Sequence, residues 1–149
     1  MNTVVPKIKP KRVDGQITGL AGELFVAAEL LKRGLQTSLT FGNAKAIDLF
    51  AFNPETGRTF TVQVKALRQK NYFPISHGKI EAQHVYVFVL LNKPGEAVEY
   101  FIVPGSKLMG EPELFTKSFV DSKFPGIHSN VLQQLGFGNA WHFFHEPMR

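Results

Sequence analysis

The sequence contains no cysteine among its 149 residues, which excludes a disulfide framework and a thiolate zinc site. No apolar run approaches the length of a membrane span, and the N-terminus lacks the apolar segment of a secretory signal peptide. The nucleophile motif G-x-S-x-G, the phosphate-binding P-loop and the zinc motif H-E-x-x-H are also missing. We therefore expect a cytoplasmic protein outside these enzyme classes.

Acidic residues are outnumbered, because 12 Asp and Glu stand against 17 Lys and Arg and leave a net charge of +5. A basic balance favours a polyanionic partner such as a nucleic acid. With 44% hydrophobic and 12% aromatic residues, the composition is that of a globular protein. The length suits one domain, which we expect to span residues 15–149.

Residues 1–14 differ from the rest of the chain by combining four basic residues with two prolines. The prolines argue against a helix, so we expect an extended arm. Two interpretations are open for it. The arm is either a solvated tail or a segment that contacts DNA phosphates through Lys11 and Arg12.

The clearest helix is predicted from Thr18 to Gly34. Thr18 is suited to cap its first turn, and Lys32-Arg33-Gly34 is a strong stop signal. Gly19 and Gly22 interrupt the helix, which indicates a close backbone approach on that face. The apolar residues that recur at helical spacing are Leu20, Leu24, Ala27, Ala28 and Leu31.

Glu23 is the residue of this helix with a candidate chemical role. Ala27 and Leu30 follow it by four and seven residues, so its neighbours on the helix surface are small or apolar. It is either an exposed helical glutamate, as we expect for Glu29, or a partly covered carboxylate.

Two apolar strands joined by a tight turn are predicted next. The strands are Ile47–Phe52 and Phe60–Val64, and the second alternates apolar residues with polar ones. Asn53–Gly57 lies between them and supplies the Pro and Gly of a hairpin turn.

Three polar side chains come to one end of this hairpin. Asp48 opens an otherwise apolar strand, and Gln63 and Lys65 share one face of the other strand because side chains alternate. Lys and Asp are seldom buried unless paired. The group is either an Asp–Lys ion pair at a sheet edge or the site of a metal-dependent phosphodiesterase.

The remaining elements complete the expected fold. Five candidate strands and an opening helix predict an α/β fold with a mixed central sheet of about four to five strands flanked by helices. The run His84–Leu91 is typical of a strand that is covered on both faces. The other expected elements are strands at Leu35–Phe41 and Glu99–Val103, a short helix within Leu108–Phe119, a helix at Ser129–Leu135 capped by Ser129 and stopped by Gly136, and an aromatic segment at Trp141–His145.

Basic residues and aromatics follow Lys65 closely. Arg68 and Lys70 precede Tyr72 and Phe73, which we expect to form an exposed aromatic pair. This mixture suits phosphate contacts combined with stacking on a base or sugar. A loop that is merely rich in lysine is the alternative.

The order of these polar residues resembles the PD-(D/E)XK nuclease superfamily over about residues 18 to 70. In that pattern a helix carries a Glu, an Asp opens one strand, and an acidic-x-Lys tripeptide lies on the next strand. Glu23, Asp48 and Gln63-Val64-Lys65 occupy these positions in this chain. The tripeptide departs from the common pattern because it begins with Gln.

The resemblance implies a restriction-endonuclease-like core and hydrolysis of DNA with Mg²⁺ or Mn²⁺. Asp48 and Glu23 would bind the metal together with the Gln63 amide and the Val64 carbonyl, and Lys65 would assist the attacking water or stabilise the transition state. DNA is the expected partner, no membrane is involved, and a homodimer is included among the expectations.

Two other classes of function stay open. The same fold can serve as a nucleic-acid-binding module without catalysis, which the Gln63 departure favours. The chain can also be an interaction or immunity-type protein whose basic surface is unrelated to DNA. Metal binding would indicate the nuclease, and salt-sensitive DNA binding without metal would indicate the module.

Overall fold

The computed structural model describes residues 14–40, 47–120 and 123–147. The basic arm expected at residues 1–14, including Lys11 and Arg12, lies outside these ranges except for Asp14. Within the described ranges, no helix is long and apolar enough to span a bilayer.

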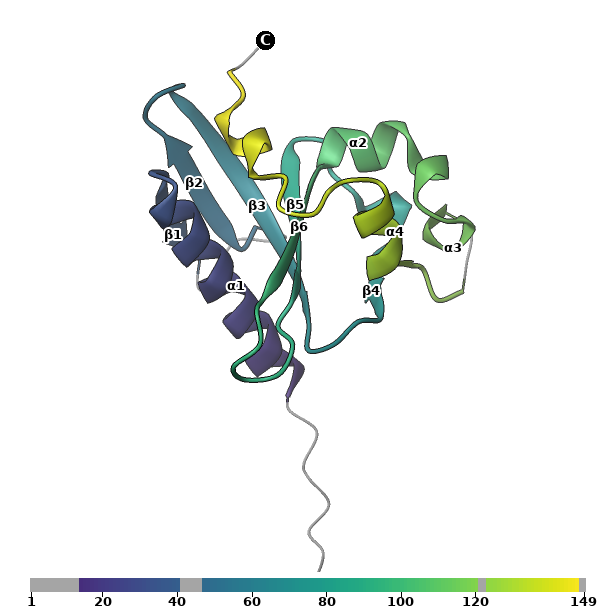
Figure 1. Cartoon of the computed structure of the whole chain (residues 1–149). Coiled ribbons are helices and arrows are strands. Elements are labelled where there is room, and N and C mark those ends of the chain that lie inside the picture. The colour runs from purple at the N-terminus through teal and green to yellow at the C-terminus, as the bar shows by residue number, and fades with distance from the viewer. Residues whose placement is uncertain (1–13, 41–46, 121–122, 148–149) are drawn as a thin grey trace, which may run out of the picture.

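A five-stranded mixed sheet forms the centre of the fold (Figure 1). The strands lie in the order β1-β2-β3-β5-β6; β3 and β5 run parallel, and the other neighbouring pairs run antiparallel. Their bounds are β1 Gln36–Leu39, β2 Leu49–Asn53, β3 Arg58–Leu67, β5 His84–Leu90 and β6 Glu99–Pro104. The predicted α/β fold, with its mixed sheet flanked by helices, is confirmed.

The hairpin between β2 and β3 forms at the predicted turn. Gly57 has a φ of 74°, a backbone conformation that glycine adopts without the strain a side chain would bring. Its N–H donates to the Asn53 carbonyl at 2.8 Å, and the Asn53 side chain accepts from the Glu55 N–H at 2.9 Å. These turn contacts set the register in which β2 pairs with β3.

Helix α1 spans Gly15–Lys32, so it begins three residues before the predicted start. Asp14 is the cap, because its side chain accepts from the Gln16 N–H at 2.9 Å. Thr18 is buried within the first turns and accepts from the Arg68 Nε at 3.0 Å. The predicted Thr18 cap is therefore wrong, whereas the stop at Gly34 is confirmed by its φ of 87°.

Gly22 allows α1 to lie close to β3. A Cβ atom added to Gly22 would stand 2.5 Å from the Cβ of Ala66 and 3.5 Å from a methyl group of Val64. The close approach predicted for this face is confirmed at Gly22 and wrong at Gly19, where an added Cβ would meet nothing within 4 Å. Val26 and Leu30 continue the buried face above Gly22.

The apolar residues that recur at helical spacing lie mostly on the outer side of α1. Leu20 and Leu24 are each 49% exposed, and Leu31 is 55% exposed. Of the predicted set, only Ala27 is buried. The helix is apolar on both sides, so its periodicity marks two stripes and does not say which one packs on the sheet. The narrower stripe that contains Gly22 packs there because it permits the closer contact.

Two separate cores cover the two faces of the sheet, and Figure 1 shows α1 on one side with α2 (Gly105–Gly110), α3 (Lys117–Val120) and α4 (Ser129–Gln134) on the other. On the first side, Val26 and Leu30 of α1 pack against β2, β3 and β5, and Trp141 and Phe144 close the core. On the second side, Phe88 of β5 packs with side chains from β4 (Tyr72–Pro74), β7 (Gly126–His128) and the short helices. All seven residues of β5 are buried, which confirms the strand predicted to be covered on both faces.

Short elements build the second layer around a small sheet that the sequence did not reveal. Strand β4 pairs antiparallel with β7, although more than 50 residues separate Tyr72 from its register partner His128. The bounds are β4 Tyr72–Pro74, η1 His77–Lys79, α2 Gly105–Gly110, η2 Pro112–Leu114, α3 Lys117–Val120, β7 Gly126–His128, α4 Ser129–Gln134 and η3 Trp141–His145.

This layer corrects two predictions. Phe73 is fully buried, so the exposed Tyr-Phe pair is wrong: adjacent strand residues point to opposite sides, and β4 turns Phe73 into the core. His128, and not Ser129, caps α4, because its Nδ1 accepts from the Asn130 N–H at 3.0 Å. The stop at Gly136 is confirmed by its φ of 83°.

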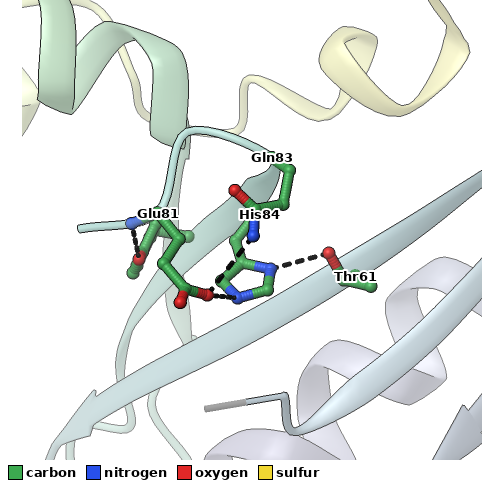
Figure 2. Close-up of polar contacts among 5 residues, drawn as sticks. Thr61, Glu81, Gln83 and His84 are labelled. Carbon is green, nitrogen blue, oxygen red and sulfur yellow. Dashed lines mark hydrogen bonds and ion pairs between the residues drawn. The ribbon is translucent and has the colours of Figure 1, made fainter. Parts of the chain in front are cut away.

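A buried histidine joins β3 to the start of β5 (Figure 2). The His84 Nδ1 lies 2.7 Å from the Thr61 hydroxyl, and its Nε2 lies 2.5 Å from a Glu81 carboxylate oxygen. Glu81 also donates its N–H to the Tyr86 hydroxyl at 3.0 Å. These contacts tie the start of β5 to its neighbouring strand β3 at Thr61, on the face of the sheet that also carries Gln63 and Lys65.

The close approach at Gly22 predicts opposite effects of alanine at the two glycines of α1. Gly22→Ala should lower the free energy of unfolding by about 1–2 kcal/mol, because the new methyl group forces α1 away from β3. Gly19→Ala should raise it by about 0.5–1 kcal/mol, because alanine favours the helix and meets no atom there. Urea unfolding of both variants checks the prediction. Equal effects at the two positions would contradict the close packing.

Candidate functional site

Asp48 lies just before β2, and its side chain takes the place of a backbone carbonyl as hydrogen-bond acceptor for β3. Its N–H donates to the Val62 carbonyl at 2.9 Å, and its side-chain Oδ2 accepts from the Val64 N–H at 2.7 Å. A buried backbone N–H without a partner is costly. The Asp48 carboxylate therefore satisfies Val64 at the point where the antiparallel pairing of β2 with β3 ends.

Glu23 brings a second carboxyl group to the same place from α1. Burial, the charge of Asp48 and a hydrogen bond between the two carboxyl groups, in this order of importance, together raise the pKa of Glu23 from 4.5 to about 7. Two carboxyl groups this close favour sharing a proton over carrying two charges. The structure thus brings Glu23 and Asp48 together and decides against a fully exposed Glu23.

Gln63 and Lys65 lie on β3 on either side of Val64. Their side chains alternate with that of Val62, which is buried in the core beneath α1, so they face the other side of the sheet. Both line a hollow of about 600 Å³ on that side. The Val64 backbone thus contacts the carboxyl pair through Asp48, while the residues before and after it line the hollow on the other side.

The Val64 carbonyl is directed to the same side as its N–H. Within a strand, the N–H and C=O of one residue point to the same neighbouring strand. The Val64 N–H meets Asp48, so the carbonyl also points toward β2, whose first paired residue is Leu49. This places a neutral oxygen near the two carboxyl groups.

The described part of the chain holds no group of three or more His, Cys, Asp or Glu side chains that could bind a metal. The oxygen donors at Val64 are instead two carboxyl groups and a backbone carbonyl, whereas the Gln63 side chain faces the hollow on the other side of the sheet. Oxygen donors of this kind suit Mg²⁺ or Mn²⁺ better than softer metals.

The residues predicted to bind DNA lie at the end of β3 and beyond it. Arg68 and Lys70 are exposed and line a second hollow together with Lys93. The Arg68 side chain also contacts the first turns of α1 through Thr18. Tyr72 is 50% exposed and lines the hollow that contains Gln63 and Lys65.

Three residues of that hollow escaped prediction from the sequence. Lys79, Lys123 and Phe124 line it beside Lys65 and Tyr72, and Phe124 is 84% exposed. Each stands in a short segment with no motif of its own. Their place in the hollow depends on the pairing of β4 with β7. No local sequence pattern predicts that pairing.

The fold is shared with a solved structure. The bacterial homing endonuclease I-Ssp6803I superposes with a TM-score of 0.53 over 89% of this chain and 93% of the endonuclease chain, at 13% sequence identity. The sequence itself matches no protein-family model and no curated protein. At this identity the likeness establishes a common fold and leaves function to the residues of the site.

The proton held by Glu23 predicts a pH dependence of stability in the absence of metal. Glu23 binds a proton up to about pH 7 in the folded chain and up to about pH 4.5 when unfolded. Its contribution to stability is therefore present at low pH and is lost as the pH rises through this range. Urea unfolding in EDTA at several pH values should show this decline in the parent protein and a flatter profile in Glu23→Gln.

The control is Glu55→Gln, which removes an exposed carboxylate from the hairpin turn. It should keep the slope of the parent between about pH 4.5 and 7. A Glu23→Gln profile as steep as that of the parent would show that the Glu23 carboxyl does not hold this proton.

Proposed function

We propose that this protein is a metal-dependent nuclease that hydrolyses DNA phosphodiester bonds. The proposal rests chiefly on the convergence of the Glu23 and Asp48 carboxyl groups at Val64, the residue that separates Gln63 from Lys65 in the chain. It is supported by the fold shared with a homing endonuclease and by the net charge of +5. We assign the chain to the PD-(D/E)XK pattern, with Gln63 in the position of the usual acidic residue.

The carboxyl pair itself is suited to a cation. The raised pKa of Glu23 reflects burial first and then the like charge of Asp48, and a divalent ion would remove the repulsion between the two carboxylates. Asp48 and Glu23 would hold Mg²⁺ or Mn²⁺, with the Val64 carbonyl and the Gln63 amide as neutral donors. When bound, the metal supplies a more acidic water and polarises a phosphoryl oxygen.

Lys65 directly follows Val64 in the sequence and is the cationic side chain that we assign to this site. It stands one residue from the Val64 carbonyl and faces the hollow on the same side as Gln63. There its ammonium group would orient the attacking water or stabilise the negative charge that develops on the phosphate. Arg68, Lys70 and Tyr72 would position the DNA strand beyond it.

The binding-module alternative is favoured by one observation, the neutral amide at position 63. An amide oxygen contributes no charge to a metal site, so binding there would be weaker than at three carboxylates. In that case the fold and basic residues would still bind nucleic acid, without cleavage. The variants described below separate the two functions.

A homodimer stays a prediction, and the outer side of α1 is the surface that we assign to it. Leu20, Leu24 and Leu31 lie on this side with Ile17, at helical spacings of three, four and seven residues, and all four are exposed. No charged residue interrupts that stripe. A helix that is apolar on both sides is normally covered on both. A dimer would also supply two sites for the two strands of a duplex.

Three substitutions at the site test the catalytic assignment. Asp48→Asn keeps an oxygen for the Val64 N–H but removes the charge, so it should abolish metal binding while the fold is retained. Lys65→Ala should spare metal binding and reduce cleavage by about 100-fold or more. Gln63→Glu adds a carboxylate and should tighten metal binding. Mn²⁺ titration and DNA cleavage are measured for each variant.

Glu55→Gln is the control for a lost carboxylate away from the site and should behave as the parent does. Cleavage by Asp48→Asn at the parental rate would show that catalysis occurs elsewhere. If the parent and Gln63→Glu both bind DNA but neither binds metal, the binding module replaces the nuclease.

The basic residues beyond β3 predict how DNA affinity depends on salt. Each phosphate contact adds about one unit to the slope of log affinity against log salt, so the double variant Arg68→Ala/Lys70→Ala should flatten the slope by about two. A salt titration of DNA binding measures this slope. The control is Lys32→Ala/Lys117→Ala, which removes two exposed charges elsewhere and should leave the slope unchanged. Equal flattening by both pairs would contradict a localised phosphate-binding surface.

A further inference from the structure

The hollow beside Lys65 combines features that a phosphate-binding surface does not need. Its volume is about 600 Å³, and its lining is more apolar than polar. This size lies within the range of sites that enclose small molecules. The residues that carry the argument are Gln63, Lys65, Tyr72, Lys79, Lys123 and Phe124.

Two exposed aromatic rings form part of the hollow. Tyr72 belongs to β4 and is held by an edge-to-face contact with His128, with ring centroids 5.2 Å apart. Phe124 is 84% exposed two residues before β7. Large aromatic side chains left this open to water are typical of surfaces that stack on a ligand ring.

The segment that carries Phe124 is brought to β4 by the close contact of β4 with β7. A Cβ added to Gly126 would lie 2.8 Å from the Phe73 carbonyl oxygen and 3.4 Å from the Tyr72 ring. Only a residue without a side chain fits there. Gly126 thus brings the segment that carries Phe124 next to Tyr72.

The charges around the hollow are of one sign. Lys65, Lys79 and Lys123 line it, and no acidic residue is among its described lining. Lysines around an apolar, aromatic interior are complementary to a molecule with a flat ring and an attached anion. A nucleotide has this composition, with a base for the rings and a phosphate for the lysines.

A base that remains paired cannot enter the hollow, because its faces are covered by its neighbours in the duplex. A phosphate backbone alone would contact the lysines and would not fill the apolar part of the hollow. We propose that the hollow receives an unpaired, unstacked nucleotide that adjoins the phosphodiester bond to be cut.

This inference rests on the proposed nuclease function and adds the class of DNA that it acts on. Lys65 belongs both to the catalytic group and to the hollow, so the bound nucleotide lies next to the reacting phosphate. The preferred substrate is therefore DNA with unpaired nucleotides in or beside a duplex. Such DNA does not bear the cost of unpairing a base before it binds.

Binding of two DNA molecules in EDTA tests the proposal with the full protein. One is a fully paired duplex, and the other carries three unpaired thymines at its centre. The parent should bind the second about tenfold or more tightly, because each stacked base contributes measurably to affinity. Tyr72→Ala and Phe124→Ala should each lose most of this preference, and Phe124→Tyr should keep it.

Phe25→Ala is the matched control, because Phe25 is also an exposed phenylalanine but lies on α1. It should keep the preference of the parent, and urea unfolding verifies that the variants are folded. Equal binding of both DNA molecules by the parent, or retention of the preference in Tyr72→Ala and Phe124→Ala, would overturn the inference and leave the nuclease proposal standing. A parent that neither binds nor cleaves DNA would overturn both.

Discussion

The hydrogen bond from the Val64 N–H to the Asp48 carboxylate is the contact on which the site depends. A backbone N–H in the middle of a sheet requires an acceptor. Where β2 begins, a side chain provides that acceptor in place of a backbone carbonyl. This fixes a carboxylate in the plane of the sheet, beside the one residue that separates Gln63 from Lys65. The chain thereby holds an acidic group near the centre of its fold without burying it unpaired.

The second constraint is the contact between α1 and β3. Gly22 lets the helix lie directly on Ala66 and Val64, and Glu23 follows it in the chain. The short distance between helix and strand allows the Glu23 carboxyl to reach Asp48 from the other element. The same packing leaves a second apolar stripe of α1 exposed. One glycine thus links the stability of the first core to the geometry of the carboxyl pair.

The two faces of the sheet differ in how completely they are covered. The face beneath α1 is closed by a continuous apolar core that includes Trp141 and Phe144. The opposite face is covered beside β5 and β6, and it carries a hollow between β3 and the small β4–β7 sheet. Polar side chains of β3 point into this hollow while the backbone of the same strand meets the carboxyl pair. A strand can present both because its side chains alternate whereas its peptide groups lie in the plane of the sheet.

The sequence by itself determined the central sheet, the hairpin and the opening helix. These depend on local rules: alternation in β3, an unbroken apolar run in β5, and glycines at Gly34 and Gly57 where the backbone needs a positive φ. It also placed Asp48, Gln63 and Lys65 near one another, because a hairpin brings its own two strands together. Only the tertiary structure decided which stripe of α1 is buried, that Glu23 meets Asp48, and that Phe124 and Tyr72 line one hollow. These relations depend on how elements distant in sequence pack, and no local pattern encodes the distance between them.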